Sequence, residues 1–589
     1  MRRHLHTPQR KQQPTRRRDR IDYLMAAIFV FGGLISVRLA DIQIFQHAFY
    51  EALAADQHNL YEQLSPKRGD ILVHDKDDPD NLYPLATNTI EYLVYAEPMR
   101  VTDVEGTLEQ LASVLEFTDE EKADLAERLK RENDLYEPVK KQVDEETMNK
   151  IKAMNLAGIE FQEEYDRYYP EKTVGSQVLG FVGYAGDTKI GQYGIEGFWD
   201  EELAGEPGFL QAEKDAQGRW ITFGTKLLQK AKDGDDIVLT IDRTIEYEAC
   251  KRLDEAVLKH GADGGSVIIT DPHTGAIKAM CGSPNFDPNA YNETEDVNAF
   301  LNPSTFYIYE PGSVFKPIVM AAALDSGAVT PDTTYEDTGA VEIGRYTIKN
   351  FDGKAHGVNT MVQVLEQSLN TGMIFVSRQM QPATMEDYIK NFGFGQKYGI
   401  QLNSEAQGDI SSLATHQDIY MATGSFGQGL SVTPLQLVAA YGAIANGGVL
   451  MKPYIVDEVI KSEDASVITE PTEIRRVISP QTSTTLGAML VKVVQNGHGQ
   501  KAGVPGYFVA GKTGTAQVPR EDGPGYDPSH TIGTFCGFAP ADNPVFTMCV
   551  KIDKPRDVQF AESTAAPLFG DLAQFLLNYY DIPPDPSAY

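Results

Sequence analysis

The stretch YEPGSVFKP, residues 309–317, decides the fold prediction for this chain. It places Ser313 three residues before Lys316, directly ahead of the apolar run IVMAAALDSGAV. Three residues are just under one helical turn, so both side chains would share one face of a helix that starts here. Pro317 suits the first turn, because the amide hydrogen that it lacks would have no partner there. The pattern therefore predicts a serine at a helix N-terminus, beside free backbone N–H groups and an amine.

Two further short motifs follow in the same half of the chain. LEQSLNTGM, residues 365–373, is predicted to be a helical segment that carries Ser368 and Asn370. VAGKTGTAQV, residues 509–518, is predicted to be a strand that carries Lys512, Thr513, Gly514 and Thr515. Each motif alone is weak, because an isolated S-x-x-K is usually an N-capping serine followed by a surface lysine. The order S-x-x-K, S-x-N, K-T-G within one domain, however, is a specific signal of a nucleophilic serine site.

The charge of the chain is strongly asymmetric. The protein has 589 residues and a net charge of −32, yet its first twenty residues carry eight Lys or Arg against one Asp. The remaining chain is therefore acidic enough to repel nucleic acid, and we expect no nucleic-acid partner. The length and the 42% of hydrophobic residues predict a globular protein of two or three domains.

Residues 21–45 are predicted to form a single transmembrane helix. From Tyr23 onward the run is mostly apolar and long enough to span a bilayer, with Arg38 and Asp41 near its outer end. The basic tail before it, residues 1–20, would stay in the cytoplasm and place the rest of the chain outside the membrane. The triplet ALA after the run resembles a signal-peptidase site but lies too far from the apolar segment. We therefore expect an uncleaved anchor in the cytoplasmic membrane.

Two domains are predicted beyond this anchor. Residues 46–232 have the pattern of short strands and turns followed by charged helices, without a catalytic constellation, so we expect a non-catalytic pedestal domain. Arg68 and Glu196 could pair there and fix the hinge between the domains, or form an ordinary surface ion pair. Residues 233–589 open with a strand, an amphipathic helix and a hairpin, and they carry the three motifs. The predicted fold class is therefore α+β and multidomain.

Four cysteines in so large a chain do not indicate a disulfide framework. Cys536 and Cys549 flank the turn APADNP on two predicted strands, so they could face each other across a hairpin. We expect instead that both are buried as small hydrophobic residues.

With its three motifs the sequence resembles the penicillin-binding proteins and serine β-lactamases, and among them the class B penicillin-binding proteins. SFGQGLSVTPLQLVAAYGAIANGG, GFAPADNP and AAPLF in the second domain are similar to that class, as are RGDIL, RYYP and GQYGIEGFWDEEL in the first. Glu310, Asn370 and Thr513 resemble the division-specific, FtsI-type members more than the elongation type. The resemblance implies an elongated α+β pedestal of the dimerisation type. It also implies a C-terminal α/β transpeptidase domain whose antiparallel sheet is flanked by helices.

The resemblance also implies a role for each motif residue. Ser313 would be the nucleophile, Lys316 its base, and Ser368 a proton relay to the leaving amine. Asn370 would hold a peptide group of the substrate. The terminal carboxylate of a D-Ala-D-Ala stem peptide would be bound by Lys512, Thr513, Gly514 and Thr515. The backbone N–H groups of Ser313 and Thr515 would form the oxyanion hole, and no metal or cofactor is expected.

These roles predict a peptidoglycan D,D-transpeptidase that cross-links stem peptides during septal cell-wall synthesis and is inhibited by β-lactams. Two alternatives remain open, a non-catalytic β-lactam-binding membrane receptor or division scaffold, and an elongation-type class B transpeptidase. Glu366 lies in an E-x-x-L-N pattern typical of hydrolases, but the pattern overlaps the S-x-N motif and is interpreted as coincidence. The resemblance further implies a polytopic membrane glycosyltransferase and other division proteins as partners.

Overall fold

The structure is a computed structural model, and it describes residues 29, 31, 59–64, 66–76, 78, 81–131, 136–186, 188–213, 227–462, 465–520, 523 and 525–588. The predicted membrane helix and cytoplasmic tail lie outside these residues, apart from Phe29 and Phe31. No helix in the described part of the chain is both long and apolar enough to cross a membrane. Two compact units are present, Met1–Ser65 with Pro207–Ala231, and Pro66–Glu206 with Lys232–Tyr589.

The first unit contains a three-stranded antiparallel sheet. Its strand order is β1 (Asn59–Leu64), β8 (Gly208–Glu213) and β9 (Leu227–Gln229). Strand β1 pairs with β8 along its whole length, from Asn59 opposite Glu213 to Leu64 opposite Gly208. The segment that follows the predicted anchor is thus joined to a hairpin from much later in the chain.

The second unit contains a seven-stranded mixed sheet. Its order is β19-β18-β10-β2-β3-β4, with β5 also pairing with β3. The strands are β2 (Ile71–His74), β3 (Leu82–Ala96), β4 (Glu137–Val143), β5 (Ile159–Tyr168), β10 (Asp236–Leu239), β18 (Val456–Ile460) and β19 (Ser466–Ile468). Strand β10 pairs in parallel with β2 and antiparallel with β18, so strands from both sides of the predicted boundary at residue 232 share this sheet. Ile71, Val73, Ile237 and Leu239 are fully buried there, and this apolar contact joins the two segments.

The charged helices predicted within residues 46–232 are present. They include α3 (Val104–Ala112), α4 (Asp119–Arg128) and α5 (Glu145–Ala153). Each helix begins at a side chain that accepts a hydrogen bond from its first turn, namely Asp103, Thr118 or Asp144. Their apolar sides pack against β3 and β4 in a small separate core. The chain then forms α6 (Ser176–Leu179), β6 (Phe181–Ala185), β7 (Thr188–Gln192), α7 (Gly194–Phe198) and α8 (Asp200–Ala204).

The predicted pair of Arg68 and Glu196 is present, and it is buried. Glu196 is 0% exposed and accepts hydrogen bonds from Arg68 Nε at 2.7 Å, Arg167 Nε at 2.6 Å and the Tyr169 hydroxyl at 3.1 Å. Arg68 also donates to Asp200 at 2.8 Å. Burial alone would raise the pKa of Glu196, but the charges of Arg167 and Arg68 outweigh it and hold the pKa below its usual value. The surface ion pair considered as the alternative is therefore not what forms.

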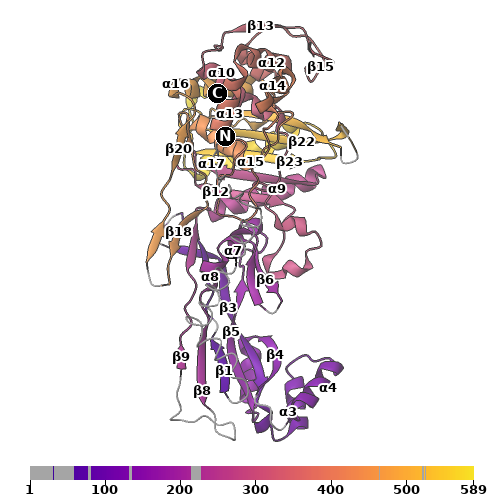
Figure 1. The fold of residues 1–589 in the computed structure, drawn as a ribbon, viewed down its shortest axis with the longest axis vertical. Helices are drawn as coiled ribbons and strands as arrows, with labels where there is room; N and C mark the ends of the chain where they lie inside the picture. The colour runs from indigo at the N-terminus through magenta and orange to yellow at the C-terminus, as the bar shows by residue number, and fades with distance from the viewer. Residues whose placement is uncertain are drawn as a thin grey trace, which may run out of the picture. The chain divides into compact units, whose positions relative to one another are not determined.

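A five-stranded antiparallel sheet forms the centre of the second half of the chain (Figure 1). Its order is β12 (Ile277–Ser283), β11 (Gly264–Thr270), β23 (Phe546–Asp553), β22 (Tyr526–Ala539) and β21 (Ala510–Pro519). One face packs against α9 (Arg243–His260) and α17 (Ala565–Tyr579), through residues such as Val267 and Ile269. The other face packs against α15 (Pro434–Ala445), with Ile268 pointing to that side. Helices therefore flank an antiparallel sheet, as the resemblance implied.

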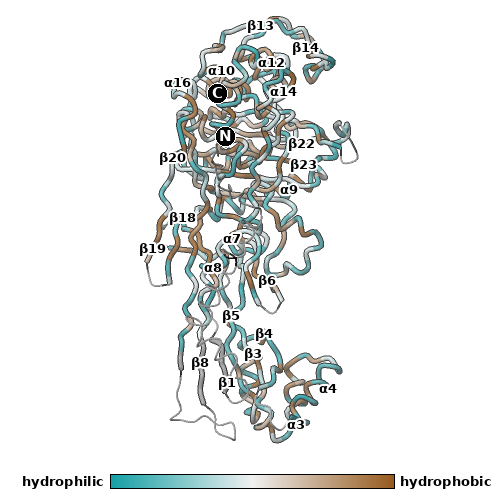
Figure 2. The backbone as a smooth tube through the Cα atoms, viewed as in Figure 1, coloured by the Kyte–Doolittle hydropathy of each residue, from teal (hydrophilic) through white to brown (hydrophobic). Residues whose placement is uncertain are grey.

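A helical lobe covers the side of the sheet that carries α15. It contains α10 (Lys316–Asp325), α11 (Met361–Glu366), α12 (Asn370–Gln379), α13 (Pro382–Asn391), α14 (Asp418–Gly424) and α16 (Pro480–Asn496). Short strands complete it, β13 (Thr334–Asp337), β14 (Ala340–Ile343), β15 (Tyr346–Lys349), β16 (Gly357–Thr360), β17 (Val449–Met451) and β20 (Glu473–Arg476). Residues from Lys316 to Ala323 are all buried, so α10 is the central helix of the lobe. Figure 2 shows hydrophobic residues in this region, whereas β5 is mostly hydrophilic.

All four cysteines form disulfides, which corrects the prediction that Cys536 and Cys549 are buried without pairing. The register of β22 and β23 places Cys536 opposite Cys549, with their Cα atoms 4.2 Å apart. Cys250 on α9 pairs with Cys281 on β12, and their Cα atoms are 5.2 Å apart. The sequence suggested only the first pair, because the second depends on how α9 packs against the sheet.

Candidate active site

Ser313 lies in a 3-10 turn, Gly312–Phe315, that leads directly into α10. The helix starts at Lys316 with Pro317 in its first turn, so the prediction of a helix start is confirmed, although Ser313 precedes the α-helix instead of opening it. Side chains three residues apart are eclipsed in a 3-10 turn. Ser313 and Lys316 therefore leave the backbone on the same side.

Lys316 is fully buried among acceptors from the S-x-N motif. Its Nζ lies 2.6 Å from the backbone oxygen of Ser368, 3.2 Å from Ser368 Oγ and 2.9 Å from Asn370 Oδ1. The side chain is 0% exposed, and burial, followed by the nearby charge of Lys512, holds its pKa well below the usual value. A neutral amine is therefore favoured at this position.

Lys512 reaches the same hydroxyl from the strand β21. Its Nζ donates to Ser368 Oγ at 3.0 Å and to the backbone oxygen of Thr513 at 3.0 Å. Lys512 is also 0% exposed, and burial lowers its pKa to about 7. The hydroxyl of Ser368 thus lies between the amines of Lys316 and Lys512. This convergence is the geometry that a proton relay requires.

Ser368 has a left-handed backbone, with φ of +55°. The sequence predicted a helical segment here, but the structure ends α11 before Ser368 and starts α12 after it. The N–H of Leu369 donates to the oxygen of Val364 at 2.9 Å, and the N–H of Ser368 to that of Leu365 at 3.2 Å. These two bonds form a Schellman motif, in which glycine usually occupies the left-handed position. A serine there costs on the order of 1 kcal/mol, so strain is stored at the site.

Strand β21 forms the edge of the five-stranded sheet, and it passes close to the turn of Ser313. A Cβ on Gly514 would lie 2.8 Å from the oxygen of Pro311 and 2.9 Å from the nitrogen of Val314. Only glycine allows this approach, which gives the third residue of K-T-G a physical reason. Thr515 Oγ1 accepts a hydrogen bond from the N–H of Ala561 at 3.1 Å.

Asn370 is the first residue of α12 and is held at both ends of its amide. Its Oδ1 accepts from Lys316, and its Nδ2 donates to the backbone oxygen of Lys349 at 3.1 Å. The structure therefore brings the three predicted motifs together in one place. They contribute Ser313, Lys316, Ser368, Asn370, Lys512, Thr513, Gly514 and Thr515.

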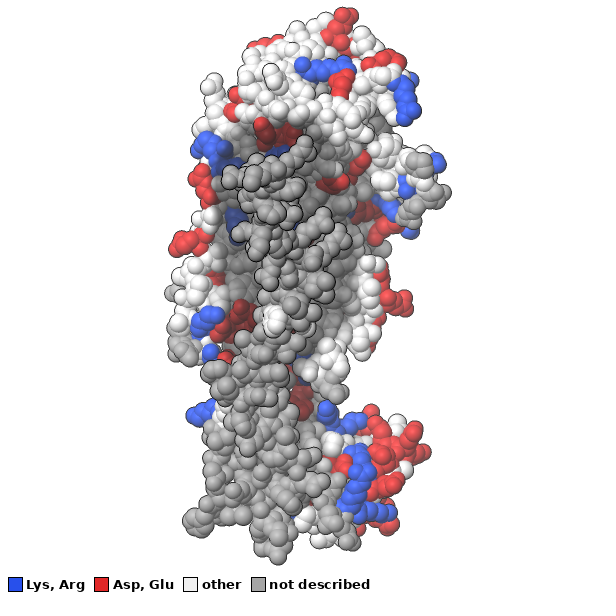
Figure 3. All heavy atoms as spheres, viewed as in Figure 1, with Lys and Arg blue, Asp and Glu red and all other residues white. Residues whose placement is uncertain are grey.

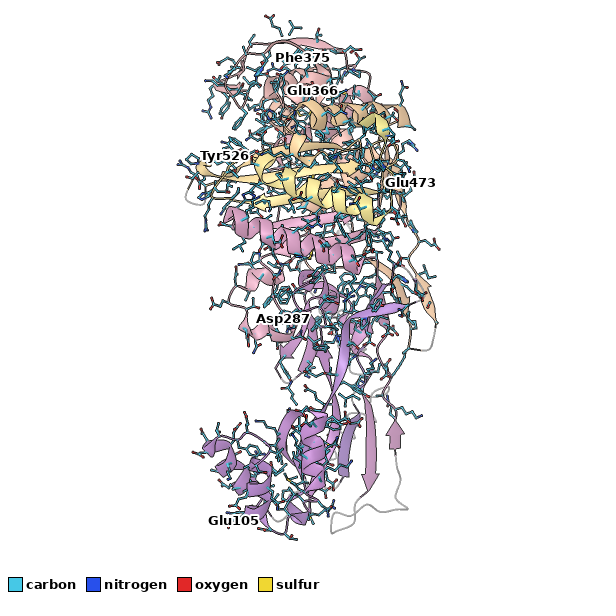
Figure 4. All side chains as sticks on the ribbon, turned by 180° about the vertical axis from the view of Figure 1, so that it is seen from behind. Glu105, Asp287, Glu366, Phe375, Glu473 and Tyr526 are labelled. Carbon is cyan, nitrogen blue, oxygen red and sulfur yellow. A yellow bond between two sulfur atoms is a disulfide. The ribbon has the colours of Figure 1, made fainter. Side chains whose placement is uncertain are left out.

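Glu310 makes contacts that the sequence did not reveal. Its Oε1 accepts from the N–H of Gly429 at 2.9 Å, and its Oε2 accepts from the hydroxyl of Tyr526 at 2.9 Å. Burial raises the pKa of this carboxyl group. Glu310 thus ties the segment before Ser313 to the loop at Gly429 and to the start of β22, where Figure 4 shows Tyr526. No spacing rule would have found this contact, because its three members are far apart in the sequence.

Glu366 is bound to α16. Its Oε1 accepts from Asn496 Nδ2 at 3.0 Å, and Figure 4 shows it among the helices of the lobe. The carboxylate that the sequence offered as a hydrolase residue therefore has a structural partner at the end of α11.

The charged side chains on the face of Figure 3 are mixed in sign. There, Lys and Arg residues alternate with Asp and Glu over the described surface, and they form no continuous basic stripe on that face. The first twenty positions, where eight Lys or Arg stand against one Asp, lie outside the described residues.

Two family models match the chain. Residues 265–574 match the penicillin binding protein transpeptidase domain, and residues 63–239 match the penicillin-binding protein dimerisation domain. Stage V sporulation protein D of Bacillus subtilis is 34% identical, over 95% of this chain and 85% of that protein. Peptidoglycan D,D-transpeptidase FtsI of Escherichia coli is 28% identical, over 98% of this chain and 95% of that protein.

Solved structures show the same architecture. Penicillin binding protein 3 of Mycobacterium tuberculosis, complexed with ampicillin, has a TM-score of 0.67 and 26% identity, over 89% of this chain and 98% of that one. Penicillin binding protein 2X of Streptococcus thermophilus has a TM-score of 0.76 at 21% identity, over 88% of this chain and 80% of that one, and supports the fold. The chain therefore belongs to the class B penicillin-binding proteins and is a β-lactam-binding peptidoglycan D,D-transpeptidase that works through a serine acyl-enzyme.

Proposed function

We propose that Ser313 is the nucleophile with which this protein cross-links peptidoglycan stem peptides. The observation that carries the proposal is the position of Ser368 Oγ between two fully buried lysine amines, at 3.2 Å from Lys316 and 3.0 Å from Lys512. A serine hydroxyl is a poor nucleophile unless a base within reach removes its proton. Lys316, with its lowered pKa and its place one 3-10 turn after Ser313, is suited to be that base.

The reaction then proceeds in two acyl transfers. Ser313 Oγ attacks the carbonyl carbon between the last two D-alanines and gives its proton to Lys316. The C–N bond breaks, and Ser368 passes a proton to the nitrogen of the departing D-alanine. The amine of a neighbouring stem peptide next attacks the ester carbon and loses a proton to the same relay. Ser313 Oγ leaves and takes a proton back, so the enzyme ends in its starting state.

The remaining motif residues bind the donor peptide. Lys512 and the hydroxyls of Thr513 and Thr515 supply a cation and two donors for the terminal carboxylate. The edge position of β21 lets an extended peptide add to the sheet next to the Ser313 turn. Asn370 holds an amide of the donor, and backbone N–H groups of Ser313 and Thr515 stabilise the oxyanion. A β-lactam occupies the place of the D-Ala-D-Ala amide.

We further propose that the protein works in septal cell-wall synthesis from the cytoplasmic membrane. The support is the FtsI-type pattern of Glu310, Asn370 and Thr513, together with the basic tail and apolar run at the N-terminus. In this scheme residues 1–20 are the cytoplasmic tail, 21–45 the anchor, 46–232 the pedestal and 233–589 the transpeptidase domain. A polytopic membrane glycosyltransferase and other division proteins are the expected partners.

Labelling with a fluorescent penicillin tests the nucleophile. The wild type should carry one covalent label by intact-protein mass spectrometry, and Ser313→Ala should fold normally yet carry none, because a partly exposed serine contributes little packing. Stoichiometric label on Ser313→Ala would overturn the assignment. A cross-linking assay on lipid-linked substrate separates the scaffold alternative, which predicts acylation without cross-links.

Depletion in the host tests the septal role. Loss of the protein should give filamentous cells that still elongate. Rounded cells would point to the elongation type, and a defect confined to spores would point to a function like that named for the Bacillus subtilis relative.

A further inference from the structure

A buried carboxylate, Asp337, lies behind the S-x-N motif and is absent from the mechanism above. It is the last residue of β13 and is 2% exposed. Its two oxygens accept hydrogen bonds from Thr371 Oγ1 at 2.7 Å, Asn350 Nδ2 at 2.7 Å, the N–H of Gly339 at 2.9 Å and the N–H of His356 at 3.0 Å. All four partners are neutral donors. Burying a carboxylate away from water costs free energy unless it accepts hydrogen bonds, so the bonds from these four donors to Asp337 are strong.

The donors come from two parts of the chain. Asn350, Gly339 and His356 belong to the excursion, which we define as residues 338–356, the segment that leaves β13 and returns through β16. Thr371 belongs to α12 and directly follows Asn370. Asp337 therefore fastens both ends of the excursion to the helix that carries the S-x-N asparagine.

The excursion in turn decides which way the amide of Asn370 points. Lys349, the neighbour of Asn350, supplies the backbone oxygen to which Asn370 Nδ2 donates at 3.1 Å. With Nδ2 held there, Oδ1 is directed to Lys316 Nζ at 2.9 Å. An asparagine amide can rotate by half a turn and exchange its donor and acceptor ends. Without the Lys349 oxygen, the contact with Lys316 alone would favour the observed orientation of the amide.

The excursion also reaches the opposite wall of the site. The ring of Phe351 packs edge-to-face on Phe560, with centroids 5.4 Å apart. Phe560 directly precedes Ala561, whose N–H donates to Thr515 Oγ1. The excursion thus contacts both the S-x-N side and the K-T-G side of the site. A shift of the excursion would therefore move residues that bind the donor peptide.

We propose that Asp337 is a positioning residue for transpeptidation. Through Asn350 and Thr371 it holds the Lys349 oxygen against Asn370 and so fixes the amide orientation with which Asn370 receives the acyl donor. This inference rests on the proposed function, because it uses the assignment of Asn370 to an amide of the donor. Asp337 does not touch the reacting atoms itself.

The test measures acylation by two β-lactams that differ only in the group Asn370 would hold. Benzylpenicillin carries an acylated amide on the lactam ring, whereas 6-aminopenicillanic acid lacks the acyl group. The informative variants are Thr371→Val, which keeps the shape but removes the hydroxyl on Asp337, and Asp337→Asn. The matched control is Thr347→Val, which removes a comparable exposed hydrogen bond from Thr347 Oγ1 to Glu342 at 2.9 Å.

Thr371→Val should lower the second-order acylation constant for benzylpenicillin about tenfold, which corresponds to about 1.4 kcal/mol. It removes the hydrogen bond to Asp337 together with the contacts of Thr371 Oγ1 to Asn350 Oδ1 at 3.0 Å and to the Tyr335 hydroxyl at 3.2 Å. The constant for 6-aminopenicillanic acid should stay within about twofold, since Asn370 has no acylated amide to hold there. Asp337→Asn should likewise lower the constant for benzylpenicillin more than the constant for 6-aminopenicillanic acid. Thr347→Val should change neither constant.

An equal loss for both compounds in Thr371→Val would show a general structural effect and overturn the inference, as would no loss for either. If Asp337→Asn does not fold, Thr371→Val alone decides the outcome. Thermal melting of every variant shows which variants are folded. Failure of the proposed function is distinguishable, because the wild type would then either carry no β-lactam on Ser313 or be acylated without forming cross-links on lipid-linked substrate.

Discussion

Replacing Lys512 with arginine should distinguish the roles of the two buried lysines, Lys316 and Lys512, through the pH dependence of acylation. Lys316 must be neutral to act as the base, whereas Lys512 must be charged to bind a carboxylate. Burial lowers the pKa of Lys512 to about 7, and burial together with the charge of Lys512 holds the pKa of Lys316 well below its usual value. Acylation by the wild type should therefore rise with pH as Lys316 loses its proton, and fall as Lys512 loses its own.

The magnitude follows from the position of the alkaline limb. Above pH 7 the charged fraction of Lys512 falls about tenfold per pH unit, so acylation of the wild type at pH 9 should be about a hundredfold below its maximum. Arginine stays charged throughout this range. Lys512→Arg should therefore lose the alkaline limb and keep the acidic one. Its maximum should be lower than that of the wild type, because a guanidinium is bulkier than an ammonium and the site is fully buried.

The assay is stopped-flow acylation with a fluorescent penicillin between pH 5 and pH 10 at constant ionic strength. Lys316→Arg should show no acylation at any pH, because a guanidinium cannot accept a proton in this range. Lys492→Arg, an exposed change on α16, is the matched control and should reproduce the wild-type profile. An alkaline limb that persists unchanged in Lys512→Arg would refute the assignment of that limb to Lys512.

Three further changes test single features of the fold. Gly514→Ala should push β21 away from the Ser313 turn and lower acylation by about a hundredfold, measured with the same penicillin, and unchanged acylation would disprove the close approach. Ser368→Gly and Ser368→Ala should both lose acylation. In urea unfolding, the glycine variant should be more stable than the alanine variant by about 1 kcal/mol, because glycine adopts the left-handed backbone without strain. Equal stability of the two variants would mean that this backbone is not strained. Glu196→Gln should lower the free energy of unfolding by about 3 to 5 kcal/mol, since it leaves the charges of Arg68 and Arg167 without their anion. Because the fold lowers the pKa of Glu196, the wild type should keep this stabilisation above the ordinary carboxyl pKa and lose it as the pH falls through the folded pKa. The melting temperature of Glu196→Gln should lack this loss of stability in acid.

Local patterns predicted two elements of the site, the helix after Ser313 and the strand of K-T-G. The Pro311-Gly312 pair, with Pro317 ahead of an apolar run, indicated a helix start at Ser313, and α10 begins three residues later, at Lys316. Apolar residues around K-T-G indicated the strand, and β21 spans Ala510–Pro519. Both features depend on residues close together in the sequence, where capping and backbone preferences act directly.

The same reasoning failed where distant segments meet. It treated the S-x-N segment as one helical stretch, but Ser368 interrupts it with a left-handed backbone that only the packing of α11 and α12 explains. It missed the disulfide between Cys250 and Cys281, because no local pattern tells which face of α9 lies on the sheet. It also gave no sign that β10 pairs with β2, since strand pairing is decided by long-range register and burial.

The sequence by itself determined which chemical groups this protein owns and in what order they occur, because motif spacing and helix and strand signals are properties of neighbouring residues. Only the tertiary structure decided that Lys316 and Lys512 meet at the hydroxyl of Ser368 and that both are fully buried. That convergence comes from packing β21 against the Ser313 turn and α16, and α10 against α12 and α16. The burial then lowers the pKa of both lysines, so the chemistry of the site depends on contacts that sequence spacing does not contain.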